Sequence, residues 1–315
     1  MKKLIQILLC AVMAAFLLAG CGSNISSSAP ADGRLRIVST VFPSYDFARA
    51  IAGEYADVTI LLSPGMESHS YEPTPQDMIR IQNCDLFLYT GGESDAWVDD
   101  LLSSLDKPVN TVKMMDCVNV YEEEMLEGMQ EEEPSGEHET EYDEHVWTSP
   151  KNAVRISRAI EKALCGIDPD NAAFYQKNAD SYAAELESMD QRFRDFFAGV
   201  SKKIMVFGDR FPFRYFAEEY GLECFAAFPG CSSETEPSAA TIAFLTDKVK
   251  SENISTVFYI EFSNHQVADS IAEAAGAKTA LFHSCHNVSA QDQKDGATYL
   301  SLMEQNLNTL KEALR

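Results

Sequence analysis

Runs of apolar and β-branched residues alternate with helical patterns along the first part of the chain. Three such runs are typical of buried strands: residues 35–42, 56–63 and 85–90. Helical patterns separate them over residues 45–53 and 75–83, and the second of these is expected to begin with Thr74 as N-cap and Pro75 as its first residue. This alternation predicts a parallel sheet covered by helices.

The same alternation returns in the second part of the chain. The apolar runs there are residues 203–208, 255–262 and 277–282. Helical patterns lie near residues 211–220, 239–251 and 266–275. The fold class predicted is therefore α/β, with two lobes that each contain a parallel sheet.

One long helical pattern lies between the two lobes. Residues 171–200 contain one glycine and no proline. A helix of this length runs about 45 Å, which is longer than one lobe needs. We expect a rigid connection between the lobes, with a coiled-coil arm as the alternative. The boundaries expected are an N-terminal lobe over 34–168, a linking helix over 169–200 and a C-terminal lobe over 201–315.

The N-terminal lobe contains a strongly acidic segment, residues 121–144. It holds eleven Glu and one Asp but neither Lys nor Arg, and its internal histidine is His138. Such a block of like charges predicts a mobile, solvated loop.

The chain begins with the pattern of a signal peptide. Lys2 and Lys3 precede an apolar run that is short for a membrane-spanning helix. It ends in Leu18-Ala19-Gly20-Cys21, which resembles a bacterial lipobox. We expect cleavage after residue 20, a lipid on Cys21, a flexible tether over 21–33, and a location on the extracytoplasmic face of the cell membrane. An ordinary signal peptide or an anchor helix is the alternative.

Composition narrows the function classes. The chain has 315 residues, of which 45% are hydrophobic, so neither a disordered chain nor a multi-span membrane protein is expected. The formal net charge is −24, which disfavours nucleic acid as a partner and is compatible with gathering cations.

The remaining cysteines form no CxxC pair, so a thiolate zinc knuckle is not expected. Cys224 and Cys231 are near enough in sequence to bridge a short loop, although sequence does not establish connectivity. Cys285 lies close to two histidines in the sequence. It could have a metal or redox role there, and a buried free thiol is the alternative.

Potential metal ligands recur at the ends of the predicted strands. His69 follows the second strand, and His145 directly precedes a helix start at Ser149-Pro150. The others follow or end strands of the second lobe: Asp209, Glu261, His283 and His286. Ligands collect at the carboxyl ends of strands in open α/β sheets, so we expect one metal site between the lobes. Imidazole with carboxylate suits Zn²⁺, and more oxygen ligands would favour Mn²⁺.

At these residues the sequence resembles the cluster A-I (family 9) metal-binding lipoproteins of zinc and manganese ABC importers. The resemblance runs from about residue 35 to the C-terminus. Its most specific parts are Pro64-Gly65-Met66-Glu67-Ser68-His69-Ser70-Tyr71-Glu72-Pro73 and Asp143-Glu144-His145-Val146-Trp147-Thr148-Ser149-Pro150. It implies two (β/α) lobes joined by one long helix, with the metal in the cleft between them. It also implies delivery of the metal to a membrane permease and its ATPase by a monomer without catalytic activity.

The resemblance identifies ligands clearly in the first lobe but not in the second. His69 and His145 match the N-terminal pair of the family. In the second lobe Arg210 falls on a ligand position, and Arg does not bind cations. The ligand set implied is therefore His69, His145, Asp209 and His283, with Glu261 and His286 in reserve. Three nitrogens and one carboxylate favour Zn²⁺ as the transported ion, with Mn²⁺ as the alternative.

Two other classes of protein compete with this interpretation. A secreted zinc hydrolase would need an open coordination position and a general base such as Glu67, Glu72 or Glu261. The sequence contains no HExxH or GxSxG motif, so we do not expect an enzyme. A surface adhesin, or a binding protein for another solute, is the third possibility.

Overall fold

The computed structural model describes residues 33–67, 69, 71–129, 141–232 and 236–314. The predicted signal peptide, Cys21 and nearly all of the tether lie outside the described residues. From Arg34 onward the chain forms one unit. Among the described helices, none is long and apolar enough to cross a membrane.

The first sheet contains four parallel strands in the order β2-β1-β3-β4. Their bounds are β1 Leu35–Ser39, β2 Ala56–Ile60, β3 Leu86–Tyr89 and β4 Thr111–Lys113. In the register, Ile37 of the central strand β1 lies opposite Val58 on one side and Leu86 on the other. The side chains of β3 are buried throughout, as expected of a strand covered on both faces.

The second sheet repeats this arrangement in the order β6-β5-β7-β8, again all parallel. Its strands are β5 Ile204–Phe211, β6 Glu223–Pro229, β7 Thr256–Tyr259 and β8 Lys278–Leu281. The register of β5 against β6 shifts between Phe207 and Arg210. Two parallel sheets with helices confirm the predicted fold class.

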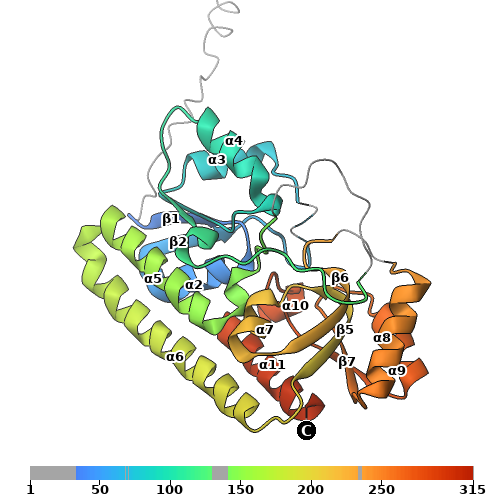
Figure 1. The fold of residues 1–315 in the computed structure, drawn as a ribbon. Coiled ribbons are helices and arrows are strands. Elements are labelled where there is room, and N and C mark those ends of the chain that lie inside the picture. Colours follow the sequence, from blue (N-terminus) through green and yellow to red (C-terminus); the bar gives the residue numbers. More distant parts are fainter. Residues whose placement is uncertain (1–32, 68, 70, 130–140, 233–235, 315) are drawn as a thin grey trace, which may run out of the picture. The chain divides into compact units, whose positions relative to one another are not determined.

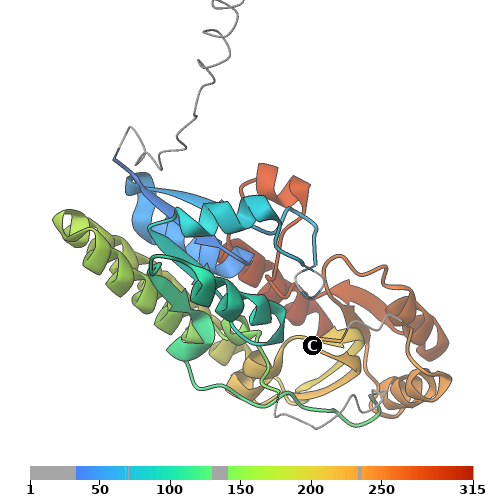
Figure 2. The same cartoon turned by 90° about the horizontal axis from the view of Figure 1, so that it is seen from above.

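Helices lie between successive strands along the chain, and two more follow the last strand; Figures 1 and 2 show their arrangement. The α-helices are α2 Phe42–Ala52, α3 Pro75–Gln82, α4 Ala96–Ser104, α5 Pro150–Ile167, α6 Ala172–Ala198, α7 Arg214–Tyr220, α8 Ala239–Ser251, α9 Gln266–Ala275, α10 Ala290–Lys294 and α11 Tyr299–Ala313. Short 3-10 helices are η1 Gly53–Tyr55, η2 Glu93–Asp95, η3 Met114–Cys117, η4 Val146–Thr148 and η5 Pro169–Asn171.

Helix α6 is the long helix predicted between the sheets. It packs along α5 and also contacts α2, α7 and α11, as Figure 1 shows (yellow-green). Leu186 in its middle and Phe193 near its end are fully buried, and the Phe193 ring meets Phe216 of α7 edge-on at 5.1 Å. A helix buried along its length is no coiled-coil arm, so that alternative is wrong.

The two sheets share the main hydrophobic core, and each also has a smaller cluster of its own. The main cluster of buried side chains includes Ile37 and Leu88 of the first sheet together with Phe207 and Phe258 of the second. Helix α11 follows the second sheet in sequence but is tied back to the first part of the chain. Its Tyr299 N–H donates to the buried Asp46 carboxylate of α2 at 2.9 Å.

Cys224 and Cys231 are both free, so the structure does not contain the disulfide considered from sequence. Cys224 lies near the start of β6 and Cys231 lies beyond its end. The extended strand separates residues 224 and 229 alone by about 16 Å. A disulfide requires Cα atoms within about 7 Å, so a short loop was the wrong interpretation of this segment.

Candidate metal centre

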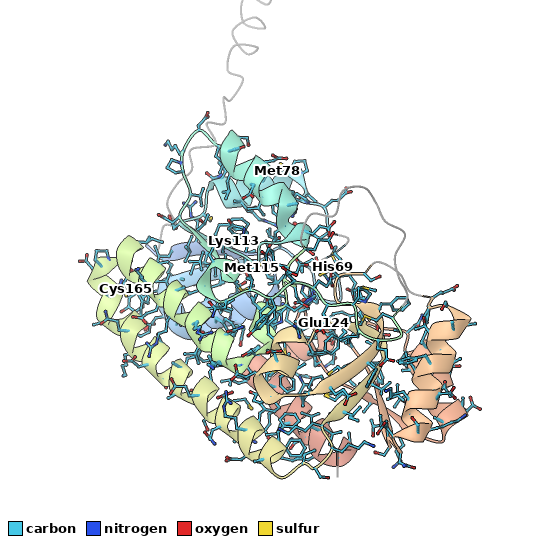
Figure 3. All side chains as sticks on the ribbon, in the orientation of Figure 1. His69, Met78, Lys113, Met115, Glu124 and Cys165 are labelled. Atoms are coloured by element: carbon cyan, nitrogen blue, oxygen red, sulfur yellow. The ribbon has the colours of Figure 1, made fainter. Side chains whose placement is uncertain are left out.

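His69 lies in the loop between β2 and α3. The C-terminal end of this loop is fixed by a capping box between Thr74 and Asp77, and Asp77 also accepts a hydrogen bond from the Tyr71 hydroxyl at 3.0 Å. Its N-terminal end is held from the second half of the chain, because the Asn287 side-chain amide donates to the carbonyls of Ser63 and Met66 at 2.8 and 2.9 Å. The loop therefore carries His69 to the junction of the two sheets (Figure 3).

His145 lies just before η4 and is buried. Its backbone N–H donates to Asp143 Oδ1 at 2.8 Å, and its ring Nδ1 lies 3.2 Å from the same oxygen. This contact leaves Nε2 as the nitrogen that faces away from the carboxylate. A carboxylate behind a histidine is the usual arrangement that orients a metal-binding imidazole.

A glycine lets the turn after β6 approach the His145 ring. A Cβ atom at Gly230 would lie 3.3 Å from both Cε1 and Nδ1 of His145 and 3.0 Å from the Phe211 carbonyl oxygen. The side of His145 next to the second sheet is thus closed by backbone.

His286 is positioned by the loop that follows β8. Glu261 accepts hydrogen bonds from the backbone N–H groups of Ser284 and His286, at 2.7 and 3.2 Å. Cys285 between them has a φ of +63°, which reverses the chain direction. The result is that His286, and not His283, turns toward the first half of the molecule.

The three imidazoles meet at one point. The His69 ring centroid lies 5.5 Å from that of His145 and 5.3 Å from that of His286, and the last two are 5.4 Å apart. One nitrogen from each ring lies within 4.8 Å of the other two. These rings line a cavity of about 10 Å³, which has room for about one water-sized sphere. Three neutral imidazoles around such a space are a suitable donor set for a transition metal.

Burial and neighbouring charges shift the pKa values of His286 and His145 in opposite directions. Burial lowers the pKa of His286 well below its usual value, and the charges of His69, His145 and Arg210 lower it further. Burial also acts to lower the pKa of His145, but Asp143, Glu144 and Glu123 outweigh it and the pKa is raised. His286 is therefore held neutral, whereas at His145 a proton competes with a metal ion.

Glu144 connects His69 to the rest of the site. Its Oε1 lies 3.2 Å from Nδ1 of His69, and the Ser94 hydroxyl donates to the same oxygen. Burial acts to raise the pKa of Glu144, but His69, His145 and Ser94 outweigh it and the pKa is lowered. The Glu144 carboxylate is thus kept charged although it is buried.

The structure places the other predicted ligands outside this group. Asp209 uses both carboxylate oxygens on backbone N–H groups, those of Arg210 at 2.8 Å and Ile260 at 3.2 Å. At His283, Nδ1 accepts from the Cys285 N–H at 2.9 Å, so in the neutral ring the proton is on Nε2 and no lone pair is left for a metal.

The two remaining polar groups of the cavity are also engaged. Glu261 accepts the loop hydrogen bonds described above and contacts His283 at 3.4 Å. The Arg210 guanidinium pairs with Glu67 at 3.1 Å. The ion pair joins the His69 loop to β5.

The described ends of the acidic segment are ordered against the site. Glu122 and Tyr142 form an antiparallel bridge, and the Tyr215 hydroxyl donates to the Asp143 carbonyl at 2.6 Å. Residues 130–140 lie outside the described residues, and with them His138 and the predicted loop centre. Sequence reasoning missed Asp143 and Glu144 as partners of the imidazoles; their position directly before His145 was the available signal.

Comparison with known proteins identifies the family to which the chain is similar. The family model described as "Zinc-uptake complex component A periplasmic" (ZnuA) matches residues 37–313. The zinc-binding lipoprotein AdcA of Streptococcus pneumoniae is 35% identical over 314 residues, and the match covers 99% of this chain but 61% of AdcA. The high-affinity zinc uptake system protein ZnuA of Bacillus subtilis is 34% identical, with 96% of each chain covered.

Solved structures show the same fold. The Zn(II)-bound ZnuA-like domain of Streptococcus pneumoniae AdcA matches with a TM-score of 0.73 at 33% identity, covering 90% of this chain and 99% of that one. The laminin-binding protein Lmb of Streptococcus agalactiae, described as an adhesin with metal-transporting activity, matches with a TM-score of 0.76 at 27% identity. That match covers 89% of this chain and all of Lmb.

Proposed function

The chain belongs to the ZnuA family of zinc-uptake component A proteins, and on this premise we propose that it is the zinc-binding component of an ABC importer. It captures Zn²⁺ outside the cytoplasm and delivers the ion to a membrane permease driven by an ATPase. A lipid on Cys21 attaches it to the membrane, as in the relatives named lipoproteins. The chain spans 61% of the length of AdcA.

The observation that carries the proposal is the convergence of three imidazoles from three separate segments on a cavity of ionic size. We assign His69, His145 and His286 as ligands. His286 takes the place that Asp209 and His283 had in the sequence prediction, because both of those residues use their donor atoms within the protein.

The donor set favours zinc over manganese. Three nitrogens suit Zn²⁺, whereas Mn²⁺ is better served by carboxylate, carbonyl and water oxygens. The function needs capture and release of one ion and no turnover, in agreement with relatives that are named as uptake and binding proteins.

Competitive titration of the metal-stripped protein with Zn²⁺ and Mn²⁺ tests this function. We expect one tight Zn²⁺ site and much weaker Mn²⁺ binding. His286→Ala should weaken Zn²⁺ binding by at least about 100-fold, whereas His283→Ala should change it far less. Absence of tight binding in the unchanged protein would overturn the function, and a larger loss in His283→Ala would overturn the ligand assignment.

A further inference from the structure

A second group of donor atoms lies beside the three imidazoles. One donor atom each from His69, Glu144 and Cys231 lies within 4.8 Å of the other two. The Cys231 Sγ lies 3.8 Å from Glu144 Oε1, and the same oxygen lies 3.2 Å from Nδ1 of His69. We propose that His69, Glu144 and Cys231 form a second coordination position for the transported ion, with a thiolate as one ligand.

The position is built by three segments that the fold brings together. His69 comes from the loop after β2, Glu144 from the residues before η4, and Cys231 from the turn after β6. Gly230 lets this turn approach His145, and the Cys231 backbone N–H is fixed by a hydrogen bond to Glu123 Oε1 at 3.1 Å. The thiol is therefore held at the site from both sides.

The chemistry of this group suits zinc. Thiolate, imidazole and carboxylate are the three ligand types that Zn²⁺ takes in proteins. On binding, Cys231 releases its thiol proton to solvent, and the ion displaces the Ser94 hydroxyl from Nδ1 of His69 and Oε1 of Glu144. A thiolate also discriminates against Mn²⁺, which prefers oxygen ligands.

The two positions use opposite sides of one ring. Nδ1 of His69 faces Glu144, which leaves Nε2 for the group formed with His145 and His286. Filling both at once would require a fully deprotonated imidazole, so we infer that one ion occupies one position or the other. The inference rests on the proposed function, because the same cargo uses both positions.

Cobalt(II) as a probe of the metal-stripped protein tests the second position, since a thiolate ligand produces an intense near-ultraviolet charge-transfer absorption. The His286→Ala variant disables the three-imidazole group and leaves His69, Glu144 and Cys231 unchanged. We expect this variant to show the thiolate absorption with one Co²⁺ bound. Adding Cys231→Ser should abolish it, whereas adding Cys165→Ser, a half-buried thiol at the far end of α5, should not.

The outcomes are distinguishable. The second position is overturned if His286→Ala shows no thiolate absorption, or if the absorption persists after Cys231→Ser is added. The proposed function stays intact in either case if the unchanged protein binds Zn²⁺ tightly. Loss of tight Zn²⁺ binding in the unchanged protein overturns the proposed function itself. Circular dichroism of each variant identifies loss of folding, and Cys231→Ala then replaces Cys231→Ser.

Discussion

Asp143 orients His145, which is one of the three proposed metal ligands. Its Oδ1 accepts from the His145 backbone and contacts the His145 ring, so the carboxylate fixes both the place and the orientation of the imidazole. We expect Asp143→Asn to lower the affinity for Zn²⁺ roughly 10- to 100-fold, because the neutral amide is a poorer partner for the ring.

Chelator competition measures this effect. The matched control is Asp269→Asn, which also removes a carboxylate beside a histidine, His265, but at an exposed position on α9. Equal losses in the two variants would show that net charge, and not the contact with His145, sets the affinity.

Asp95 is a buried carboxyl with a direct effect on stability. Burial raises its pKa to about 7, and the charge of Glu144 adds to this, against hydrogen bonds from the Gly91 and Thr90 N–H groups. Between about pH 4 and pH 7 the folded state then binds more protons at Asp95 than the unfolded state does. Stability is therefore lost as the pH rises through this window, and the full penalty is present above it.

The variant Asp95→Asn removes this dependence, since it cannot ionise. We expect the unchanged protein to lose stability relative to the variant when the pH is raised from 4 to 8. The difference in the free energy of unfolding between the two proteins should change by an amount on the order of 4 kcal/mol. Urea denaturation of the metal-stripped proteins at the two pH values measures the difference. Parallel changes in both proteins would contradict the shift at Asp95.

The sequence predicted two of the three imidazoles that the structure brings together, and these stay predicted ligands. His69 and His145 were selected because each lies in a specific motif, and His286 was only a reserve candidate. Nothing in the sequence indicates that Cys285 adopts a positive φ, in the loop where His286 and not His283 lines the cavity. The distinction depends on tertiary hydrogen bonds to Glu261, which local patterns do not encode.

Several elements with strong local signals were predicted, whereas strands β4 and β6 and helix α11 were missed. Helix α9 has the predicted bounds, and α3 begins at the predicted cap. Strand β4 has three residues, too few for a pattern. Strand β6, Glu223–Pro229, contains only two aromatic residues between alanines, cysteine and proline, and its buried neighbours make it a strand. Helix α11 was not predicted although it contributes several core residues.

Helix α6 offers a test of its packing at the element scale. Leu186 is fully buried, and its neighbour Glu187 is exposed. We expect Leu186→Ala to lower the free energy of unfolding by about 2–5 kcal/mol and Glu187→Ala to change it by less than about 0.5 kcal/mol. Denaturant unfolding measures both values. Small effects in both would contradict a helix buried against α2, α5 and α11.

For the whole molecule, Zn²⁺ bound at the proposed site would be a ligand of the folded state that connects loops from both sheets. At a free concentration of about 1,000 times the dissociation constant, binding adds about 4 kcal/mol to stability. For a chain of this size that corresponds to a rise in melting temperature of roughly 10 °C. Thermal unfolding with Zn²⁺ should show this rise, which a chelator reverses, and His286→Ala should reduce it. An unchanged melting temperature would mean that the ion does not bind the folded state more tightly than the unfolded state.

The shared hydrophobic core has a consequence for how the chain can be divided. Helix α11 follows the second sheet in sequence but packs beside α2 and α6, so it covers helices from the first half of the chain. A fragment that stops after α6 would lack this cover, and one that starts at β5 would expose the apolar side of α11. The two halves resemble domains in topology and each has a smaller core cluster of its own, but the main cluster joins them, so cutting the chain between them would expose apolar surface on both.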